Sequence, residues 1–204
     1  LTRHMLSGVT IIDPQNTYID EGVIIGMDTV IYPGSILRGN TRIGDNCIIG
    51  PQAHLEDVRV DERVVINHSV VLQSEILAGS RIGPFAYIRP GCVVGPEAKV
   101  GDFVELKNTR MGAGSKASHL AYLGDADIGS MVNIGCGAIT VNYDGFEKHR
   151  TVIDDQAFIG CNVNLIAPVR VGKGAYVAAG STVTHDVPEN ALAIARERQS
   201  IKEG

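Results

Sequence analysis

The chain has 204 residues, of which 44% are hydrophobic and 20% are charged, so it is neither intrinsically disordered nor built around membrane-spanning helices. Its net charge of −5 argues against nonspecific nucleic-acid binding, which requires a broad basic face. The 24 glycines, with only 5% aromatic residues and no tryptophan, predict many tight turns around a narrow core. We expect one sizeable domain with at most a short appendage.

The first twenty residues lead into this domain. The sequence LTRHMLSGV is typical of the end of an amphipathic helix that Gly8 terminates. Natural chains rarely begin inside a helix, so residues 1–20 are predicted to hold the end of a linker helix and the segment entering the main domain, in a fragment of a longer protein. No signal peptide precedes the first motif.

A hydrophobic repeat of six residues dominates residues 21–185. Glycine often follows the repeated aliphatic residue. The repeated positions are Ile25, Ile31, Leu37, Ile43, Ile49 and Leu55, then Ile82, Ile88, Val94, Val100 and Leu106, then Ile128 and Ile134, and finally Ile153, Ile159, Leu165, Val171, Val177 and Val183. This period fits neither an α-helix nor a hairpin strand, and it predicts a triangular solenoid in which roughly 18 residues close one coil.

The predicted fold is therefore all-β, a left-handed parallel β-helix of hexapeptide repeats. Each aliphatic side chain is expected to point to the axis, where β-branched residues suit a stacked, pleated environment. Successive coils should lie about 4.8 Å apart, and the glycines after the aliphatic residues should supply positive φ at the corners. The alternative, a β-sandwich, requires longer strands and a period of two.

Four segments depart from the repeat. Residues 58–77 blur its phase, which indicates an imperfect coil without a chemical role. Between Met111 and Ile128, and again between Ala138 and Ile153, the repeat breaks outright. These two breaks predict two protruding loops, which are frequent locations of function on a rigid scaffold. Residues 186–204 lose the repeat and predict a polar C-terminal arm.

His119 lies in the first predicted loop, shortly before Tyr122. A neutral imidazole is a natural general base for an ammonium or hydroxyl nucleophile, although a surface histidine without a role is the plain alternative. The other histidines show no metal-ligand spacing, so the sequence predicts no metal site. The four cysteines show no C-x-x-C spacing either and predict free thiols in a reducing cytoplasm.

Arg89 and Lys107 are 18 residues apart, which places them on the same face of neighbouring coils. Two cations stacked in this way can clamp a phosphate, or they can be two solvated surface charges. Polar residues around the second predicted loop either bind a ligand or satisfy turn backbones. These residues are Asn133, Asn142, Tyr143 and Lys148.

The segment SKASHLAYLGDADIGSMVNIGCGAITVNYDGFEKHRT, with GVTIIDPQNTYID, ELKNT and ENALAIARERQSIKEG, closely resembles one protein family. It is similar to the acetyltransferase half of the bacterial bifunctional glucosamine-1-phosphate acetyltransferase and N-acetylglucosamine-1-phosphate uridyltransferase. The resemblance covers essentially the whole chain. It implies acetyl transfer from acetyl-CoA to the amine of glucosamine-1-phosphate, a step toward UDP-N-acetylglucosamine, by a cytoplasmic homotrimer with active sites between subunits.

The resemblance also implies roles for individual residues. His119 matches the base that accepts a proton from the sugar amine, which attacks acetyl-CoA directly. The matched sugar-phosphate pocket consists of Arg89, Lys107, Tyr122 and Asn133, with Lys148 nearby. The residues matched to acetyl donor and coenzyme A contacts are Asn142, Tyr143, Ala179 and Arg196, with Cys136 and Cys161 where the family often has alanine and serine.

One departure from the family pattern limits what this chain is expected to do. The nucleotide-binding domain, which uses Mg²⁺ for uridyl transfer, does not match any part of this sequence. The resemblance thus implies only the acetylation step here, with no metal. The alternatives are a different hexapeptide acyltransferase and a non-catalytic scaffold or trimerisation module. The two predicted loops argue against the module, because a purely structural solenoid does not need them.

Overall fold

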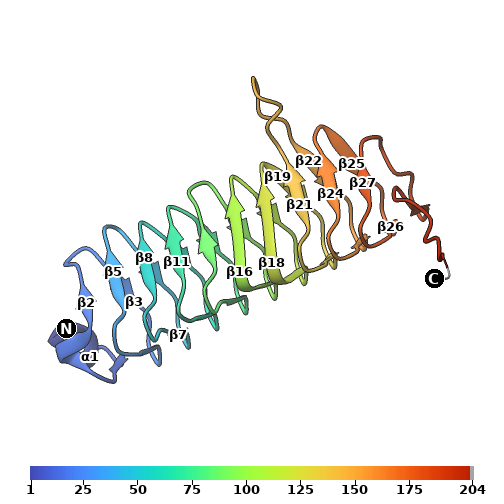
Figure 1. Ribbon diagram of the computed structural model, residues 1–204. Helices are drawn as coiled ribbons and strands as arrows, with labels where there is room; N and C mark the ends of the chain where they lie inside the picture. Colours follow the sequence, from blue (N-terminus) through green and yellow to red (C-terminus); the bar gives the residue numbers. More distant parts are fainter. Residues whose placement is uncertain (203–204) are drawn as a thin grey trace.

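The computed structural model describes residues 1–202, which fold into a triangular prism of stacked coils, a left-handed parallel β-helix (Figure 1). A short helix, α1 (Thr2–Leu6), precedes the prism, and a 3-10 helix, η1 (Pro14–Asn16), lies in its first coil. The two ends of the chain lie at opposite ends of the prism. The strands of successive coils pair in parallel and form a 9-stranded and a 19-stranded sheet.

The 9-stranded sheet forms one wall of the prism, which we call face A. Its strands are β3 (Ile24–Ile25), β6 (Arg42–Ile43), β9 (Arg59–Val60), β12 (Glu75–Ile76), β15 (Val93–Val94), β17 (Arg110–Met111), β19 (Ala126–Ile128), β22 (Thr151–Ile153) and β25 (Val169–Val171).

The 19-stranded sheet bends to form the other two walls, faces B and C. Face B contains β1 (Thr10–Ile11), β4 (Val30–Ile31), β7 (Ile48–Ile49), β10 (Val65–Ile66), β13 (Arg81–Ile82), β20 (Asn133–Ile134), β23 (Phe158–Ile159), β26 (Tyr176–Val177) and β28 (Leu192–Ala193). Face C contains β2 (Tyr18–Ile19), β5 (Ile36–Arg38), β8 (His54–Glu56), β11 (Val70–Leu72), β14 (Tyr87–Ile88), β21 (Ile139–Val141), β24 (Asn164–Ile166) and β27 (Thr182–Val183). Two longer strands, β16 (Lys99–Lys107) and β18 (Lys116–Gly124), turn the edge between B and C and join the two walls.

The core confirms the hexapeptide prediction. The repeated aliphatic residues are all buried along the axis; Ile31, Leu37, Ile88 and Leu106, for example, have no exposed surface. Leu106 pairs in register with Ile88, so like residues stack on like residues from coil to coil. The hydrophobic effect therefore acts along one continuous column, and each coil buries its apolar residue only against its neighbours.

The glycines that follow the aliphatic residues have a different role from the predicted one. Gly50 and Gly83 do adopt positive φ, but others in this set, such as Gly135, do not. A Cβ atom on Gly135 would lie 2.6 Å from the backbone nitrogen of Cys161 in the next coil. Glycine is required here because successive backbones approach closely, and positive φ occurs elsewhere on the same corner, as at Gly137 (φ 76°).

Residues 58–77 form a regular part of the prism with shorter steps. Core residues Leu55 and Val60 are five residues apart rather than six, as are Val71 and Ile76. The strands in this segment still pair in register with both neighbouring coils. The blurred phase reflects shortened corners in an intact coil.

The prediction that the segment between Met111 and Ile128 forms a protruding loop is wrong. Residues 116–124 form the nine-residue strand β18, which pairs with β16 along its length and lies in the wall of the prism. Ala117 and Leu123 occupy core positions and are buried. The phase was lost because a small alanine fills one core position and because the step from Leu123 to Ile128 contains five residues.

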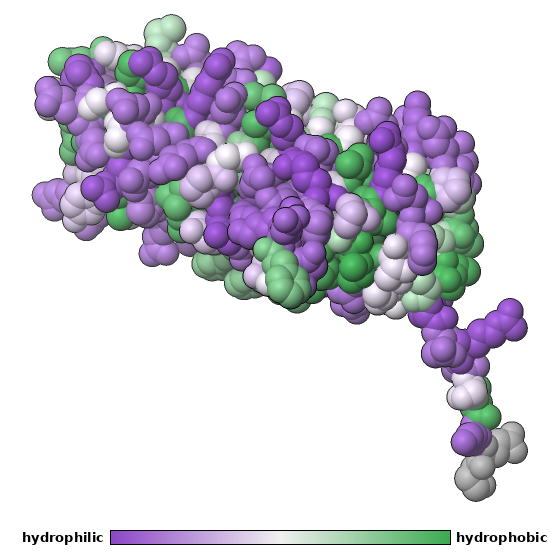
Figure 2. Space-filling model, turned by 90° about the horizontal axis from the view of Figure 1, so that it is seen from above, coloured by the Kyte–Doolittle hydropathy of each residue, from purple (hydrophilic) through white to green (hydrophobic). Residues whose placement is uncertain are grey.

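The second predicted loop is confirmed. Residues 142–150, between β21 and β22, extend well beyond the prism where faces C and A meet (Figure 1). The C-terminal arm begins later than predicted, because β28 still pairs with β26, and the coil structure likewise begins at β1 rather than at residue 21. Beyond β28 the chain leaves the body as an extended segment (Figure 2). Within residues 1–202, no helix is long and apolar enough to cross a membrane.

Candidate active site

His119 lies at the edge where faces B and C meet, the B/C edge, and its imidazole is exposed. Asp102, the residue aligned with it in the preceding coil, accepts a hydrogen bond from its Nδ1 at 2.7 Å. An ionised carboxylate can only accept, so Nδ1 carries the hydrogen and the lone pair of Nε2 faces solvent. The Asp102 pKa is lowered by a hydrogen bond from its own backbone and by the one from His119. This arrangement holds the imidazole in the tautomer that a general base requires.

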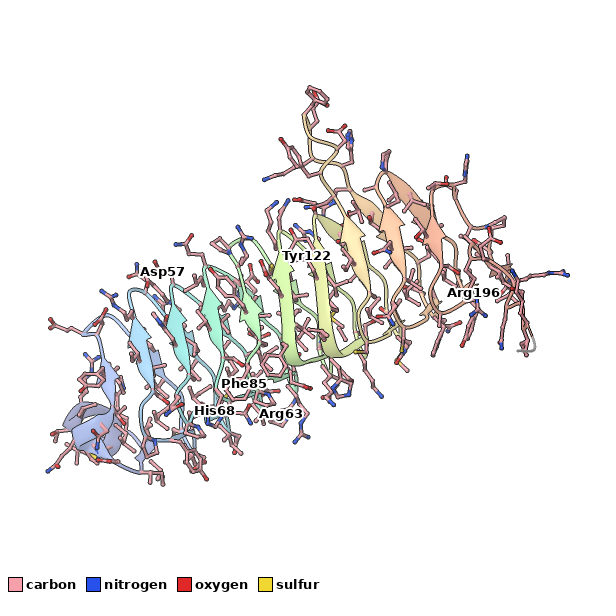
Figure 3. The ribbon with its side chains drawn as sticks, viewed as in Figure 1. Asp57, Arg63, His68, Phe85, Tyr122 and Arg196 are labelled. Carbon is pink, nitrogen blue, oxygen red and sulfur yellow. The ribbon has the colours of Figure 1, made fainter. Side chains whose placement is uncertain are left out.

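A row of exposed residues continues from His119 along the B/C edge. Successive coils stack residue on residue here, because the strand registers on both sides of the edge agree. The row contains, in order, His119, Cys136, Cys161 and Ala179, all exposed. Arg196 extends the row by one coil, with its Cδ 3.8 Å from the place of a Cβ on Gly180. Figure 3 shows Arg196 at the C-terminal end of the prism.

A second group of polar residues lies at the opposite margin of face C, where this face meets face A. Arg89 and Lys107 stack on neighbouring coils, as predicted from their spacing. Arg89 donates to the Glu105 carboxylate at 3.0 Å, and this hydrogen bond raises the Arg89 pKa. Lys107 donates from Nζ to Asp125 at 2.8 Å, which raises the Lys107 pKa.

Asp125 is the buried centre of this second group. It accepts hydrogen bonds from Lys107, from Asn108 at 2.7 Å and from Asn142. Burial opposes its charged form, but these hydrogen bonds outweigh burial and lower the Asp125 pKa. The amide of Asn142 also lies 3.5 Å from the Tyr122 hydroxyl, so Tyr122 borders the same group (Figure 3).

The protruding loop adds a third cation to the group. Lys148 lies near Lys107, which lowers the Lys148 pKa, and Arg89 lowers it more weakly. Arg150 anchors the base of the loop through two hydrogen bonds to Asp127, at 2.8 and 2.6 Å. Three cations against the two carboxylates Glu105 and Asp125 leave an excess of positive charge that suits a phosphate.

Most of the predicted site residues thus fall into two groups at opposite margins of face C. The C/A margin collects Arg89, Lys107, Tyr122, Asn142 and Lys148, and the B/C edge collects His119, Cys136, Cys161, Ala179 and Arg196. Asn133 belongs to neither, since it lies on face B between Lys116 and Phe158. Tyr143 lies in the protruding loop, where its hydroxyl donates to the Gly145 carbonyl at 2.7 Å. One chain alone does not gather all of these residues around one point.

The sequence reasoning missed three acidic residues that organise these groups, namely Asp102, Glu105 and Asp125. Asp102 precedes His119 by one coil, and Asp125 is separated from both Lys107 and Asn142 by one coil. Alignment of residues 99–107 with 116–124 as paired strands identifies the first of these partners. The mistaken loop concealed that alignment.

Across residues 1–202, no three His, Cys, Asp or Glu side chains are grouped so that they could hold a metal ion.

Two family descriptions match parts of the chain. Residues 13–111 match the GMPPB C-terminal domain, and residues 150–185 match the bacterial transferase hexapeptide repeat. The second match covers six hexapeptides in the coils that carry Cys161 and Ala179. Both agree with the repeat observed in the structure.

Curated relatives match nearly the whole chain. It is 62% identical over 199 residues to the bifunctional protein GlmU of Brevibacillus brevis, covering 98% of this chain and 43% of the relative. It is 61% identical over 201 residues to the bifunctional protein GlmU of Bacillus velezensis, covering 98% and 44%. The chain therefore spans less than half the length of these relatives.

Solved structures share the fold at lower sequence similarity. A UDP-N-acetylglucosamine acyltransferase from Campylobacter jejuni matches with a TM-score of 0.52 and 19% identity, over 91% of this chain and 71% of the other. The enzyme of that name from Francisella novicida matches with a TM-score of 0.51 and 21% identity, over 91% and 67%. Nearly the whole chain is thus similar in sequence to one part, less than half, of the bifunctional GlmU proteins, and the solved structures show that the fold is shared.

Proposed function

We propose that this chain transfers an acetyl group from acetyl-CoA to the amine of glucosamine-1-phosphate, giving N-acetylglucosamine-1-phosphate for UDP-N-acetylglucosamine synthesis. The observation that carries the proposal is the exposed His119, oriented by Asp102, at the start of a row of small residues that ends at Arg196. The cluster of Arg89, Lys107 and Lys148 supports a phosphorylated substrate. The free thiols fit a reducing cytoplasm.

In the proposed mechanism, His119 acts on the substrate amine. An aliphatic ammonium group is not nucleophilic, so Nε2 must first remove one of its protons. The free amine then attacks the thioester carbonyl, and backbone or asparagine N–H groups stabilise the resulting oxyanion. When the tetrahedral intermediate collapses, the imidazolium gives its proton to the coenzyme A sulfur and the nitrogen loses its second proton to solvent, so that one amide, one thiol and one released proton balance the reaction. This sequence requires neither a covalent enzyme intermediate nor a metal.

The residues of the C/A margin are suited to hold the sugar phosphate. Arg89 offers a planar set of donors, whereas Lys107 and Lys148 offer point charges. Asp125 fixes Lys107 through a 2.8 Å hydrogen bond, so little side-chain entropy is lost when a phosphate binds there. Fixing the substrate in this way contributes to catalysis by orienting the amine.

The residues of the B/C edge are suited to hold the coenzyme. Exposed Cys136, Cys161 and Ala179 have short side chains, which leave room for an extended pantetheine arm along the edge. Arg196 at the far end can pair with the phosphates of coenzyme A. Asn142 and Tyr143 are further proposed contacts of the acetyl donor, and Asn133 a further contact of the sugar.

We propose that the active protein is a homotrimer with active sites between subunits. His119 and the cation cluster lie at opposite margins of face C, and Asn133 lies on face B. Packing prisms side by side brings the margin of one chain against a face of another. A threefold ring closes such a heterologous contact.

The direct test is an assay of coenzyme A thiol release. With acetyl-CoA and glucosamine-1-phosphate, release should be substrate-dependent, should continue in EDTA and should yield N-acetylglucosamine-1-phosphate. Glucosamine without phosphate and serine are the comparison acceptors, because neither carries a phosphate for the cation cluster to bind. Release with serine but not with glucosamine-1-phosphate would assign the chain to a different hexapeptide acyltransferase.

A further inference from the structure

Cys136 and Cys161 are two exposed free thiols at equivalent positions of successive coils. The registers on face B and on face C bring their coils together with the same offset, so the two cysteines stack directly at the B/C edge. Backbone hydrogen bonds join the two coils on either side of the two cysteines. Gly135 N–H donates to the Ile159 carbonyl at 2.8 Å, and Asn162 N–H donates to the Cys136 carbonyl at 2.8 Å.

This stacking gives the spacing that a disulfide requires. Paired strands lie about 4.8 Å apart, and disulfides join residues whose Cα atoms are about 4.4 to 6.8 Å apart. Both side chains are exposed at the same edge, so rotation of the side chains can bring the sulfurs together with little movement of the backbone. The rigid β-helix keeps the two thiols together in the reduced protein.

The other two cysteines do not compete in this chemistry. Cys47 and Cys92 are buried in the core, and burial raises the pKa of both thiols. A thiolate is the reactive form of cysteine, so these two groups stay inert while Cys136 and Cys161 remain accessible. The chain therefore contains one accessible dithiol, Cys136 with Cys161, and two separate buried thiols that are unreactive.

We propose that Cys136 and Cys161 form a redox-active dithiol that is oxidised by the disulfide of coenzyme A. One cysteine thiolate attacks a sulfur of that disulfide, which forms a mixed disulfide and releases one coenzyme A thiolate. The second cysteine attacks the protein sulfur of the mixed disulfide, which forms the Cys136–Cys161 bond and releases the second coenzyme A thiolate. Two protein thiols lose two electrons, one disulfide gains them, and the two cysteine protons balance the two products.

The choice of oxidant rests on the proposed function. Cys136 stacks directly on His119, where the sulfur of bound coenzyme A must lie for acetyl transfer. The same site thus brings the disulfide of coenzyme A to the dithiol. The Cys136–Cys161 bond then lies on the B/C edge where the coenzyme is proposed to bind, and it blocks acetyl transfer until a reductant opens it.

The test follows the intact mass of the full chain. The protein is incubated with coenzyme A disulfide, with 2-hydroxyethyl disulfide or with reduced coenzyme A, and the remaining thiols are blocked before mass spectrometry. We expect coenzyme A disulfide to yield a species that carries two fewer blocking groups than the reduced protein, with a peptide linking Cys136 to Cys161, faster than 2-hydroxyethyl disulfide does. Acetyl transfer should disappear in parallel and return with dithiothreitol, and reduced coenzyme A should change nothing.

Single substitutions trap the intermediate. Cys136→Ser and Cys161→Ser should each stop at a mixed disulfide heavier by one coenzyme A moiety, because the second thiol is missing. If neither oxidant gives the Cys136–Cys161 linkage in the wild-type protein, the dithiol assignment is wrong. If both oxidants form it at equal rates, coenzyme A is not the specific oxidant. The mass measurement does not depend on catalysis, so a chain that forms the bond but never acetylates contradicts the proposed function alone.

Discussion

At the scale of single residues, His119 is oriented by the coil that precedes it. Its partner Asp102 lies on β16, and the register between β16 and β18 places the two side chains next to each other. No loop ordering is required to form the pair. The imidazole is thus presented to solvent with its base nitrogen free, on a rigid strand.

Asp102→Asn tests this orientation. An amide can donate to Nδ1 as well as accept from it, so the variant allows the wrong tautomer. We expect kcat to fall by about tenfold, a part of the usual contribution of a general base, while KM for acetyl-CoA stays unchanged. The thermal midpoint should not move, because the pair is exposed. Steady-state kinetics together with thermal unfolding separates this role from a structural one, which would lower the midpoint.

Asp125 is expected to contribute to stability in a pH-dependent way. Its pKa is lowered in the folded protein, so its contribution is complete above the ordinary carboxyl pKa of 3.8 and is lost as the pH falls through the lowered value. Near neutral pH, Asp125→Asn should cost about 1.5–3 kcal/mol of unfolding free energy, the range for charged hydrogen bonds. In acid below the lowered pKa, the difference from wild type should vanish.

Urea denaturation at both pH values measures this difference. The matched control is Asp28→Asn, an exposed corner residue with φ of 56°, a conformation that asparagine also tolerates. The control should leave the midpoint unchanged at either pH. An Asp125→Asn midpoint equal to wild type at neutral pH would show that Asp125 adds nothing to the fold.

At the scale of elements, the sequence was sufficient to predict the fold but not every coil. The period of six identified the core positions, because each is filled by an aliphatic residue that stacks on its equivalents. The period of six did not identify the coil in which Ala117 fills a core position, or the places where a corner is one residue shorter. Spacing alone cannot distinguish such a step from an inserted loop, and β18 was therefore mistaken for one.

The candidate site was predictable to a smaller extent. The coil period placed Arg89 next to Lys107 correctly. Asp102 was missed because the mistaken loop hid its alignment with His119. Asp125 was missed because its importance depends on burial and on its contact with Asn142 at the start of the protruding loop. Neither property is visible in a repeat. The individual roles of the site residues remain predictions that only kinetics can test.

The continuous core along the axis leads to a prediction about the stability that a single coil contributes. Leu106 is fully buried between neighbouring coils, so Leu106→Ala should cost about 2–5 kcal/mol of unfolding free energy, the usual range for a buried leucine. Leu6 has the same side chain but is 85% exposed, so Leu6→Ala should change stability by less than about 0.5 kcal/mol. Denaturant unfolding of both variants provides the comparison. Equal effects would contradict a shared axial core.

At the scale of the whole molecule, two stacked pairs of exposed aromatic side chains lie on face B and at the B/C edge. Phe158 stacks on Tyr176 with ring centroids 4.4 Å apart, and Phe85 stacks on Phe103 at 5.5 Å. Figure 3 shows Phe85 on the side of the prism away from the protruding loop. Paired exposed aromatics of this kind are typical of protein interfaces.

We predict that the chain forms a trimer in solution. Each chain has a mass of 21.7 kDa, and light scattering at micromolar concentration should give three times that mass. Phe158→Glu, which places a charge in the aromatic stack, should shift the population toward monomers and lower acetyl transfer in proportion. A monomer mass for the wild-type protein would contradict both the assembly and a site shared between subunits.

The most direct measurement of the central claim is the kinetics of acetyl transfer by His119→Ala beside Lys107→Ala. Loss of the base should lower kcat by about 10²- to 10⁴-fold, while coenzyme A binding and the trimer persist. Lys107→Ala should instead raise KM for glucosamine-1-phosphate, because one charge-assisted contact of about 1.5–3 kcal/mol is lost. The predicted result is this pair of distinct phenotypes. Near-normal turnover of His119→Ala at saturating substrates would contradict the proposed base and the mechanism built on it.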